Sequence, residues 1–351
     1  MTVSKLLIMD GIGGVPMGRE IHGAFQELGL ECVYHDMADL KQIPFYSLRA
    51  VYSKTVHKRR EKEGFYYLPR VQERVLERIV QQQRPNHILV IGFIYKFIRP
   101  AFIRYLSDKY ACALYLFDTD SCNLYTKRRE FLYFLEQDLP VYDKILSFSK
   151  VTTNFFVHTR GLNAEYFPFG ANPIQLPPPN QDRHKVLFVG SGDLRRILLL
   201  EHIKSLVHVY GNRWQRNFPL MSDQLRQRVV DKAVWGKELH QLFTDADIVL
   251  NITRGPFYAA ETGINLRIFE ALAAGKFLLT DYCDEVAEMF ELGVDIETFK
   301  SSSELIDKVN FYLAHPEERN RIAQAGHAKF LERYTWKARI KAMAQEMGMP
   351  N

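Results

Sequence analysis

The chain has 351 residues, of which 47% are hydrophobic and 25% charged, with a formal net charge of +5 at pH 7. This length suits two domains rather than one, and the composition excludes a disordered or collagen-like chain. Because no apolar run approaches about 18 residues and no signal-peptide pattern follows Met1, we expect a cytoplasmic protein without a membrane span.

The four cysteines are scattered, with neither a CxxC pair nor the spacing of metal ligands: Cys32, Cys112, Cys122 and Cys283. This pattern predicts buried thiols in a reducing compartment and no metal site.

The first half alternates apolar runs with amphipathic segments, as a doubly wound parallel sheet does. The predicted strands span residues 5–10, 30–35, 87–92, 112–117 and 144–148, and the predicted helices span 17–28, 71–83, 100–109 and 128–137. Ligands of such sheets bind at the carboxyl ends of the strands, so the residues that follow each strand are the functional candidates.

A glycine-rich turn follows the first predicted strand, which ends at Asp10. Gly13 and Gly14 would let a substrate pass close to the backbone, and His22 on the next helix could touch a sugar. The simpler alternative is a tight turn and a buried, hydrogen-bonded histidine.

Basic residues cluster at 54–62 and 127–129. Such runs most often form solvated loops or helix faces. The functional alternative is attraction to an anionic donor, an acceptor or the inner face of a membrane. Nucleic acid is disfavoured because the basic residues do not form a stripe with aromatic residues between them.

A stiff, polar segment with three consecutive prolines separates the two halves. We therefore predict an N-terminal domain over 1–176, a linker over 177–184, a C-terminal domain over 185–333 and a crossover helix over 334–351. The predicted fold class is α/β, with two Rossmann-like doubly wound domains that face a central cleft and a last helix that crosses back to the first domain.

The strand–helix rhythm restarts after the linker, with predicted strands over 185–189, 207–210, 247–251 and 277–280. Small or polar residues follow these strands, among them Gly190, Ser191 and Asn251. Arg195 could reach a diphosphate, and Gly236 could leave room for a planar base. Glycines after strands are common, so each feature alone is weak.

The most informative stretch is a glycine turn over 263–265 that opens a short helix, which Gly275 ends. Such a turn aims unpaired backbone N–H groups at one point, where the helix dipole favours an anion. Arg267 and Glu270 lie on the same side of this helix, where arginine suits a phosphate and a carboxylate suits ribose hydroxyls. The alternative is an ordinary helix with an i,i+3 ion pair.

Several motifs together carry a family resemblance: Val189-Gly190-Ser191 with Arg195, Tyr210-Gly211, 246–251, 265–275, 315–319, Ala325-Gly326 and Tyr334-Thr335-Trp336. Over residues 185–340 they resemble the C-terminal domain of GT-B glycosyltransferases, in the group related to the spore-maturation protein CgeB and allied with the GT4-like superfamily. The segments 118–120 and 170–173 are similar too, but less specific.

The resemblance implies a nucleotide-sugar donor in the C-terminal domain and an acceptor in the N-terminal domain. Arg195 and Arg267 would bind the diphosphate, Glu270 the ribose, and the backbone near Gly236 the base. GT4-like enzymes usually carry two glutamates separated by seven residues, whereas here Thr262 holds the first position and Glu261 lies one step away. The donor-binding candidates are Gly190, Ser191, Arg195, Tyr210, Gly236, Asn251, Gly263, Ile264, Asn265, Arg267 and Glu270, and the sugar or acceptor contacts are Gly13, Gly14, His22 and Glu261.

We therefore predict a glycosyltransferase that moves a sugar from a nucleotide diphosphate, such as a UDP-sugar, to a glycan, a lipid-linked saccharide or a protein. Neither a metal nor another cofactor is expected, because arginines and helix N–H groups can stabilise the leaving diphosphate. In an inverting reaction Asp118, Asp120 or Asp10 could act as the general base, although an Asx turn explains Asp118 and Asp120 equally well. A nucleotide-sugar epimerase and a non-catalytic nucleotide-sugar binding module remain alternatives, whereas a nicotinamide oxidoreductase lacks its dinucleotide fingerprint.

Overall fold

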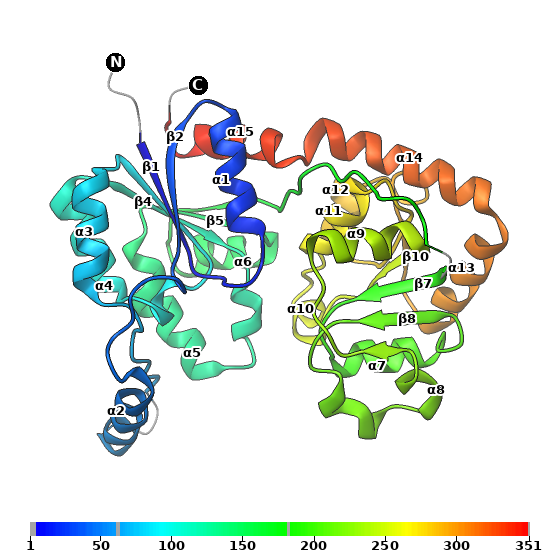
Figure 1. Ribbon diagram of the computed structural model, residues 1–351, viewed down its shortest axis with the longest axis horizontal. Coiled ribbons are helices and arrows are strands. Elements are labelled where there is room, and N and C mark those ends of the chain that lie inside the picture. The colour runs from blue at the N-terminus through cyan, green and yellow to red at the C-terminus, as the bar shows by residue number, and fades with distance from the viewer. Residues whose placement is uncertain (1–4, 61–63, 181–182, 350–351) are drawn as a thin grey trace. The chain divides into compact units, whose positions relative to one another are not determined.

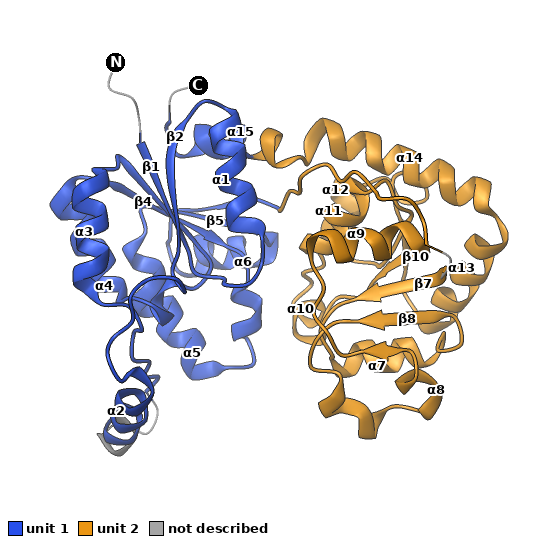
Figure 2. Ribbon diagram, in the orientation of Figure 1, with its two compact units in different colours: residues 1–168, 340–351 blue, residues 169–339 orange. Residues whose placement is uncertain are grey.

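The computed structural model describes residues 5–60, 64–180 and 183–349, with the side chains of 57–60 left aside. The chain forms two compact units, one of residues 1–168 with 340–351 and one of residues 169–339 (Figure 2). Each unit is a six-stranded parallel sheet with helices on its faces (Figure 1). The prediction of two Rossmann-like doubly wound α/β domains is confirmed.

The sheet of the first unit has the strand order β2-β1-β3-β4-β5-β6. Its strands are β1 (Lys5–Asp10), β2 (Glu31–Asp36), β3 (His87–Ile91), β4 (Ala113–Asp118), β5 (Lys144–Ser147) and β6 (Ala164–Tyr166). Its helices are α1 (Met17–Glu27), α2 (Tyr46–Arg60), α3 (Glu73–Gln83), α4 (Pro100–Tyr110), α5 (Arg128–Tyr133) and α6 (Lys150–Asn154). Chain order changes direction at β1, where Asp10 pairs in register with Asp36 on one side and Ile91 on the other.

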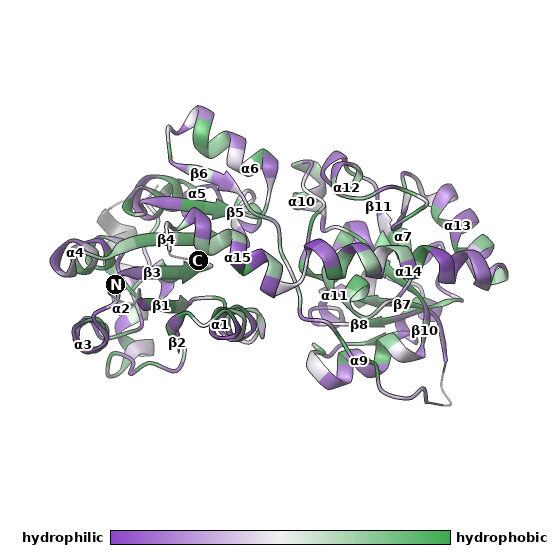
Figure 3. Cartoon of the chain, turned by 90° about the horizontal axis from the view of Figure 1, so that it is seen from above, coloured by the Kyte–Doolittle hydropathy of each residue, from purple (hydrophilic) through white to green (hydrophobic). Residues whose placement is uncertain are grey.

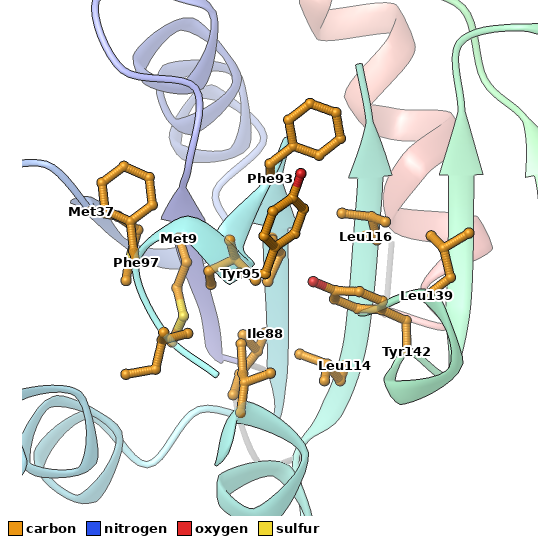
Figure 4. Packing of buried hydrophobic residues seen from close by; sticks show 14 of the residues in the cluster. Met9, Met37, Ile88, Phe93, Tyr95, Phe97, Leu114, Leu116, Leu139 and Tyr142 are labelled. Carbon is orange, nitrogen blue, oxygen red and sulfur yellow. The ribbon is translucent and has the colours of Figure 1, made fainter. Parts of the chain in front are cut away.

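The core of the first unit lies on the central strands, which are apolar along nearly their whole length (Figure 3). Met9, Ile88, Leu114 and Leu116 project from β1, β3 and β4 into one cluster, where Tyr95 joins them (Figure 4). Burial on both faces explains why these strands are continuous apolar runs rather than alternating ones.

Between β2 and α3 the chain leaves the sheet and forms an arm that carries α2, which extends beyond the rest of this unit (Figure 1). An antiparallel bridge between Gln42 and Val71 closes the base of the arm. The Ile43 N–H donates to the Arg70 carbonyl at 2.8 Å, so the two ends of the arm are fixed to each other.

The sheet of the second unit has the strand order β12-β11-β10-β7-β8-β9. Its strands are β7 (His184–Val189), β8 (Val207–Tyr210), β9 (Val229–Val230), β10 (Ala246–Asn251), β11 (Leu278–Asp281) and β12 (Glu297–Phe299). Its helices are α7 (Leu194–Glu201), α8 (Asp223–Arg226), α9 (Gly236–Asp245), α10 (Gly255–Ala259), α11 (Leu266–Ala273), α12 (Asp284–Met289), α13 (Ser302–Ala314) and α14 (Pro316–Arg333). Side chains of α7 and α13 pack with the sheet in one buried cluster.

The proline-rich segment belongs to the second unit, which begins at Phe169. The Pro177 carbonyl accepts a hydrogen bond from Thr244 of α9 at 3.0 Å, and Pro178 accepts one from Gln241 at 3.1 Å. The predicted first-domain end at 176 and the linker over 177–184 therefore differ from the observed units, because the prolines pack against α9 and His184 already begins β7.

The last helix, α15 (Trp336–Glu346), begins in the second unit and ends in the first. In the first unit the Tyr115 hydroxyl of β4 donates to the Met347 carbonyl at 2.8 Å. Lys144 of β5 forms an ion pair with Glu346. The first unit is thus built from both ends of the described chain.

Candidate functional site

The carboxyl ends of three neighbouring strands in the second unit, β11, β10 and β7, bring polar residues together. Asp281 ends β11 and is 2% exposed. It accepts hydrogen bonds from the Thr253 N–H at 3.0 Å and from the Arg195 guanidinium at 2.6 Å. Asp281 therefore ties the segment after β10 to helix α7, a role that the sequence analysis missed.

Arg195, a predicted diphosphate ligand, is engaged on two sides in this structure. Besides Asp281, its guanidinium donates to the Thr253 carbonyl at 2.8 Å and lies 3.6 Å from the ring centroid of Tyr258. Its side chain remains 22% exposed and borders a hollow of 620 Å³ that Lys300 also lines. A diphosphate would have to share Arg195 with Asp281.

The neighbouring Arg196 is buried and holds the turn that follows β7. Its guanidinium donates to the carbonyls of Ile252 at 2.8 Å and Ser191 at 2.9 Å. Burial, with the positive charge of Arg254 nearby, lowers the pKa of Arg196 to about 9. Ser191, a predicted donor contact, is thus committed to Arg196 through its carbonyl.

Two glycine turns approach each other closely at the ends of β7 and β8. A Cβ atom on Gly211, whose φ is +144°, would lie 1.9 Å from the Gly190 carbonyl oxygen. That carbonyl also accepts a hydrogen bond from the Trp214 indole at 2.9 Å. Gly190 is therefore explained by packing, and the Tyr210 side chain lines a different hollow beside His208.

Helix α11 carries the predicted phosphate and ribose ligands. Asn265 caps it by accepting a hydrogen bond from the Arg267 N–H at 3.1 Å. Arg267 and Glu270 form an ion pair of 2.8 Å, with side chains only 10% and 12% exposed. The predicted common face of these two side chains is thus present, and they contact each other across it.

The loop before α9 lies beside this ion pair. The Arg267 guanidinium is 5.9 Å from the ring of Trp235 and 5.7 Å from the ring of Phe243. Gly236 has φ of +54° and no heavy atom within 4 Å of the position that a Cβ would take. The structure therefore brings Trp235 and Gly236 close to the Arg267–Glu270 pair.

The remaining donor candidates have structural explanations. A Cβ on Gly263 would lie 2.2 Å from the Cys283 sulfur, and Ile264 is buried. Asn251 is buried and donates to the Thr280 hydroxyl at 2.9 Å. Glu261 is exposed on a turn with φ of +57°, a backbone conformation that costs free energy in a non-glycine residue.

The first unit contains a cavity of 260 Å³ at the carboxyl ends of β1, β3 and β4. Gly11, Gly92 and Thr119 follow these three strands and line it. Its other lining residues are Ile12, Tyr67, Arg70, Phe93, Lys96, Phe97 and Asp120. Aromatic rings, two cations and one carboxylate thus meet where a parallel sheet binds its ligand.

The three candidate bases differ in access. Asp118 is 2% exposed and accepts hydrogen bonds from the hydroxyls of Ser121 at 2.6 Å and Ser147 at 2.9 Å. Asp10 is 1% exposed and accepts one from the Tyr34 hydroxyl at 2.8 Å. Burial raises the pKa of Asp10 and of Asp118. Of the three carboxylates, Asp120 alone lines the cavity, which argues against Asp10 and Asp118 as bases.

The predicted sugar or acceptor contacts of the first unit also differ in how accessible they are. His22 bonds to the Cys32 carbonyl of β2 at 3.4 Å, the structural alternative that the sequence left open. Gly13 and Gly14 have φ of +66° and +74°, with nothing within 4 Å of their Cβ positions. The space beside this glycine turn is open, and contact with a ligand there stays a prediction.

The basic cluster at 54–62 lies partly outside the described side chains, and 61–63 lie outside the described residues. At 127–129, Lys127 forms an ion pair of 3.4 Å with Glu130. In the part of the chain that the structure describes, we find no helix both long and apolar enough to cross a lipid bilayer.

Comparison with known proteins shows what this chain is similar to. Residues 195–345 match the model of a family described as glycosyl transferase-like. The spore protein CgeB of Bacillus subtilis (strain 168) is 24% identical over 226 residues, which cover 59% of this chain and 69% of CgeB.

Solved glycosyltransferase structures share the whole fold at low identity. HepE of Anabaena, in complex with UDP and glucose, superposes with a TM-score of 0.64 at 13% identity, covering 98% of this chain and 99% of that one. Sucrose-phosphate synthase of Thermosynechococcus elongatus gives 0.61 at 11% identity, covering 98% of each chain. The chain therefore has the GT-B fold, and residues 195–345 match the glycosyl transferase-like family, in agreement with the resemblance to CgeB-like and GT4-like glycosyltransferases.

Proposed function

We propose that this protein is a glycosyltransferase and that it takes its sugar from a nucleotide diphosphate bound at helix α11. The observation that carries the proposal is the Arg267–Glu270 pair, in which both side chains are about nine-tenths buried at the start of the helix. The Arg267 Nε atom has no hydrogen-bond partner among the described residues. A buried donor of this kind is costly unless a ligand satisfies it.

The surroundings of the pair favour a nucleotide over a simple phosphate. Glu270 would accept hydrogen bonds from the ribose hydroxyls, and Arg267 would turn its free N–H towards the diphosphate. The open backbone at Gly236 and the half-exposed ring of Trp235 offer a flat surface for a base. HepE, a protein of the same fold, was solved with UDP and with UDP-glucose, which supports a uridine nucleotide as the first candidate.

The proposed transfer needs no metal ion. As the bond between sugar and diphosphate breaks, negative charge grows on the leaving phosphate, and Arg267 and the N–H groups of α11 would stabilise it.

The acceptor would bind in the cavity of the first unit. Asp120 lines that cavity and is partly exposed, so it can take a proton from an acceptor hydroxyl if the reaction inverts the anomeric centre. The acceptor class remains a glycan, a lipid-linked saccharide or a protein, as the sequence predicts.

Calorimetric titration of the purified protein with UDP, UDP-glucose and GDP, with and without EDTA, tests the donor site. We expect binding of one nucleotide that EDTA leaves unchanged. The variants Arg267→Gln and Glu270→Gln should each weaken it about tenfold or more, since each removes a charge-assisted hydrogen bond. Arg321→Gln, on the exposed side of α14, is the matched control.

A double variant, Arg267→Gln with Glu270→Gln, separates ligand binding from a structural role. Each single variant leaves one buried charge unpaired and can lose stability for that reason alone. If the folded double variant binds the nucleotide as well as the wild type does, the proposal is wrong. Isomerisation of the sugar without an acceptor would instead identify an epimerase.

A further inference from the structure

The cavity of the first unit holds more positive than negative charge. Arg70 and Lys96 face it from the arm and from the turn after β3, against the single carboxylate of Asp120. The Thr119 side chain, in a residue 9% exposed, has its hydroxyl buried without a hydrogen-bond partner among the described residues. Two cations beside an unsatisfied hydroxyl are the groups that an oxyanion binds.

The surroundings of Lys96 neutralise it only in part. Its ammonium lies 3.7 Å from Glu130, but Lys127 contacts the same carboxylate at 3.4 Å. The ammonium also lies 4.8 Å from the ring of Phe93, and burial lowers the pKa of Lys96. One carboxylate is therefore shared by two lysines, which leaves positive charge available to a ligand.

We propose that this cavity binds a phosphate group carried by the acceptor, with Arg70, Lys96 and the Thr119 hydroxyl as its ligands. This inference rests on the proposed function and names the substrate class: a phosphate-bearing acceptor whose nucleophilic hydroxyl lies towards Asp120. A sugar phosphate and a lipid-linked phosphate both offer that chemistry.

Titration with inorganic phosphate, followed by the chemical shifts of the protein, tests the site without any donor. We expect Arg70→Gln and Lys96→Gln each to weaken phosphate binding about tenfold. Lys109→Gln removes a cation that pairs with Glu77 on the outer helices, and should have no effect. Glucose 6-phosphate and farnesyl phosphate, each compared with its unphosphorylated alcohol, then distinguish the two sources.

Two results would overturn the proposal. Phosphate could bind equally well to wild type and to both cavity variants, or its binding could be lost in Arg267→Gln instead, which would place the anion in the second unit. Because the titration contains no nucleotide, phosphate binding in this cavity can be measured even if the donor proposal is wrong.

The arm of the first unit carries a second, independent feature. Three large hydrophobic side chains of helix α2 are exposed, Leu48, Val51 and Tyr52, by 72%, 69% and 73%, and Phe45, which directly precedes the helix, is 78% exposed. Val51 and Tyr52 lie three and four residues after Leu48, which places these three side chains on one face of the helix.

The opposite face of α2 makes the contacts that hold the helix. The Tyr46 hydroxyl donates to the Leu68 carbonyl at 3.1 Å, and the Ser53 hydroxyl donates to the Tyr66 hydroxyl at 2.7 Å. This helix therefore turns a partly polar face towards its own unit and an apolar face away from it, which is the reverse of an ordinary surface helix.

The charge of α2 distinguishes between two possible partners for its apolar face, a second copy of the chain and a membrane. The sequence from 46 to 60 contains five basic residues and no acidic residue. Two copies joined through this face would bring ten like charges together, whereas a bilayer with anionic lipids would attract them. A helix with an apolar face and cationic flanks lies in the membrane interface.

We infer that α2 inserts its apolar face into an anionic membrane surface, with Leu48 and Val51 in the acyl boundary. The sequence predicts a membrane contact from the basic cluster, and this inference assigns that contact to α2. It does not depend on the donor site.

Sedimentation with vesicles tests the inference on the full chain. We expect binding to vesicles of phosphatidylcholine with 30% phosphatidylglycerol, weak binding to phosphatidylcholine alone, and loss of binding in high salt. Leu48→Glu with Val51→Glu should reduce the bound fraction at least fivefold, whereas Leu220→Glu, a leucine 58% exposed in the second unit, is the control.

Equal binding of the double variant and the wild type would overturn the inference, as would no binding to either vesicle. Analytical ultracentrifugation tests the alternative, in which a second copy of the chain binds this face. A dimer that the double variant abolishes would support that alternative.

Discussion

Asp138 is a fully buried acid in the segment that follows α5. Burial raises the pKa of its carboxyl to about 8, and the nearby Tyr142 hydroxyl only partly offsets this. The folded chain therefore keeps a proton that the unfolded chain releases near the ordinary pKa of about 3.9. Because the folded state then binds more protons, stability falls as pH rises between about 4 and 8, by up to about 1.4 kcal/mol per pH unit.

We expect Asp138→Asn to flatten this fall, measured as the melting temperature between pH 5 and pH 8. Asp223→Asn changes an exposed carboxylate on α8 and should leave the pH profile unchanged. Burial also raises the pKa of Asp118, so a smaller slope of the same sign should remain. A profile identical to that of the wild type would show that Asp138 does not titrate in this range.

At the residue scale, the sequence predicts side chains that belong to one element better than those that meet across elements. Arg267 and Glu270 are three residues apart on one helix, so their contact follows from helix geometry. Asp10 could not be recognised as buried, because its cover is Gly18 of α1, where a Cβ would lie 2.1 Å from its carboxylate. Asp281 was missed because its partners lie in the segment after β10 and in α7, and only strand order makes them neighbours.

At the element scale, a substitution in the turn before α11 can test whether Gly263 is needed for packing or for a ligand. A Cβ at this position would lie 2.2 Å from the Cys283 sulfur and 3.1 Å from its Cβ. We expect Gly263→Ala to destabilise the protein by about 1–3 kcal/mol through overpacking, in urea unfolding. Adding Cys283→Ala removes the sulfur and should restore part of that loss.

The double-mutant cycle distinguishes packing from a ligand role, because the two roles predict different coupling free energies between Gly263 and Cys283. The double variant should lose less free energy of unfolding than the two single variants lose in sum, because Cys283→Ala removes the clash. Its nucleotide affinity should stay near that of the wild type. Additive losses, or a selective loss of nucleotide affinity, would instead assign Gly263 to the ligand.

Strands and helices with strong patterns were predictable, and those without were not. The run 5–10 is β1 residue for residue, because a parallel strand buried on both faces is a continuous apolar run. The run 207–210 is β8, in which buried valines alternate with His208 and Tyr210. The strands β9 and β12 span two and three residues, too short for any period. Helix α2 was missed because its apolar side chains face away from the core, so its pattern does not resemble that of a packed helix.

At the scale of the whole molecule, the first unit depends on the last residues of the described chain. Ile340, Met343 and Met347 of the C-terminal segment are buried there. Removing residues 340–351 should cost the first unit several kcal/mol, at about 1.5–3 kcal/mol for each buried apolar side chain. Hydrogen exchange should then quicken in β4 and β5 and stay unchanged in β7 and β10.

A chain shortened only after Met347 keeps these contacts and is the control. Equal acceleration in both units would show that the terminal segment stabilises the molecule as a whole rather than the first unit.

The two-ended construction of the first unit has a consequence for how the protein is made. A ribosome delivers residues 169–339 in one uninterrupted stretch, so the second unit can fold while synthesis continues. The first unit has its six strands by then but still lacks the segment that covers Tyr115, because residues 340–351 emerge later. Its sheet must wait until residues 340–351 have emerged, and nascent chains stalled before residue 340 should present an incomplete first unit to chaperones.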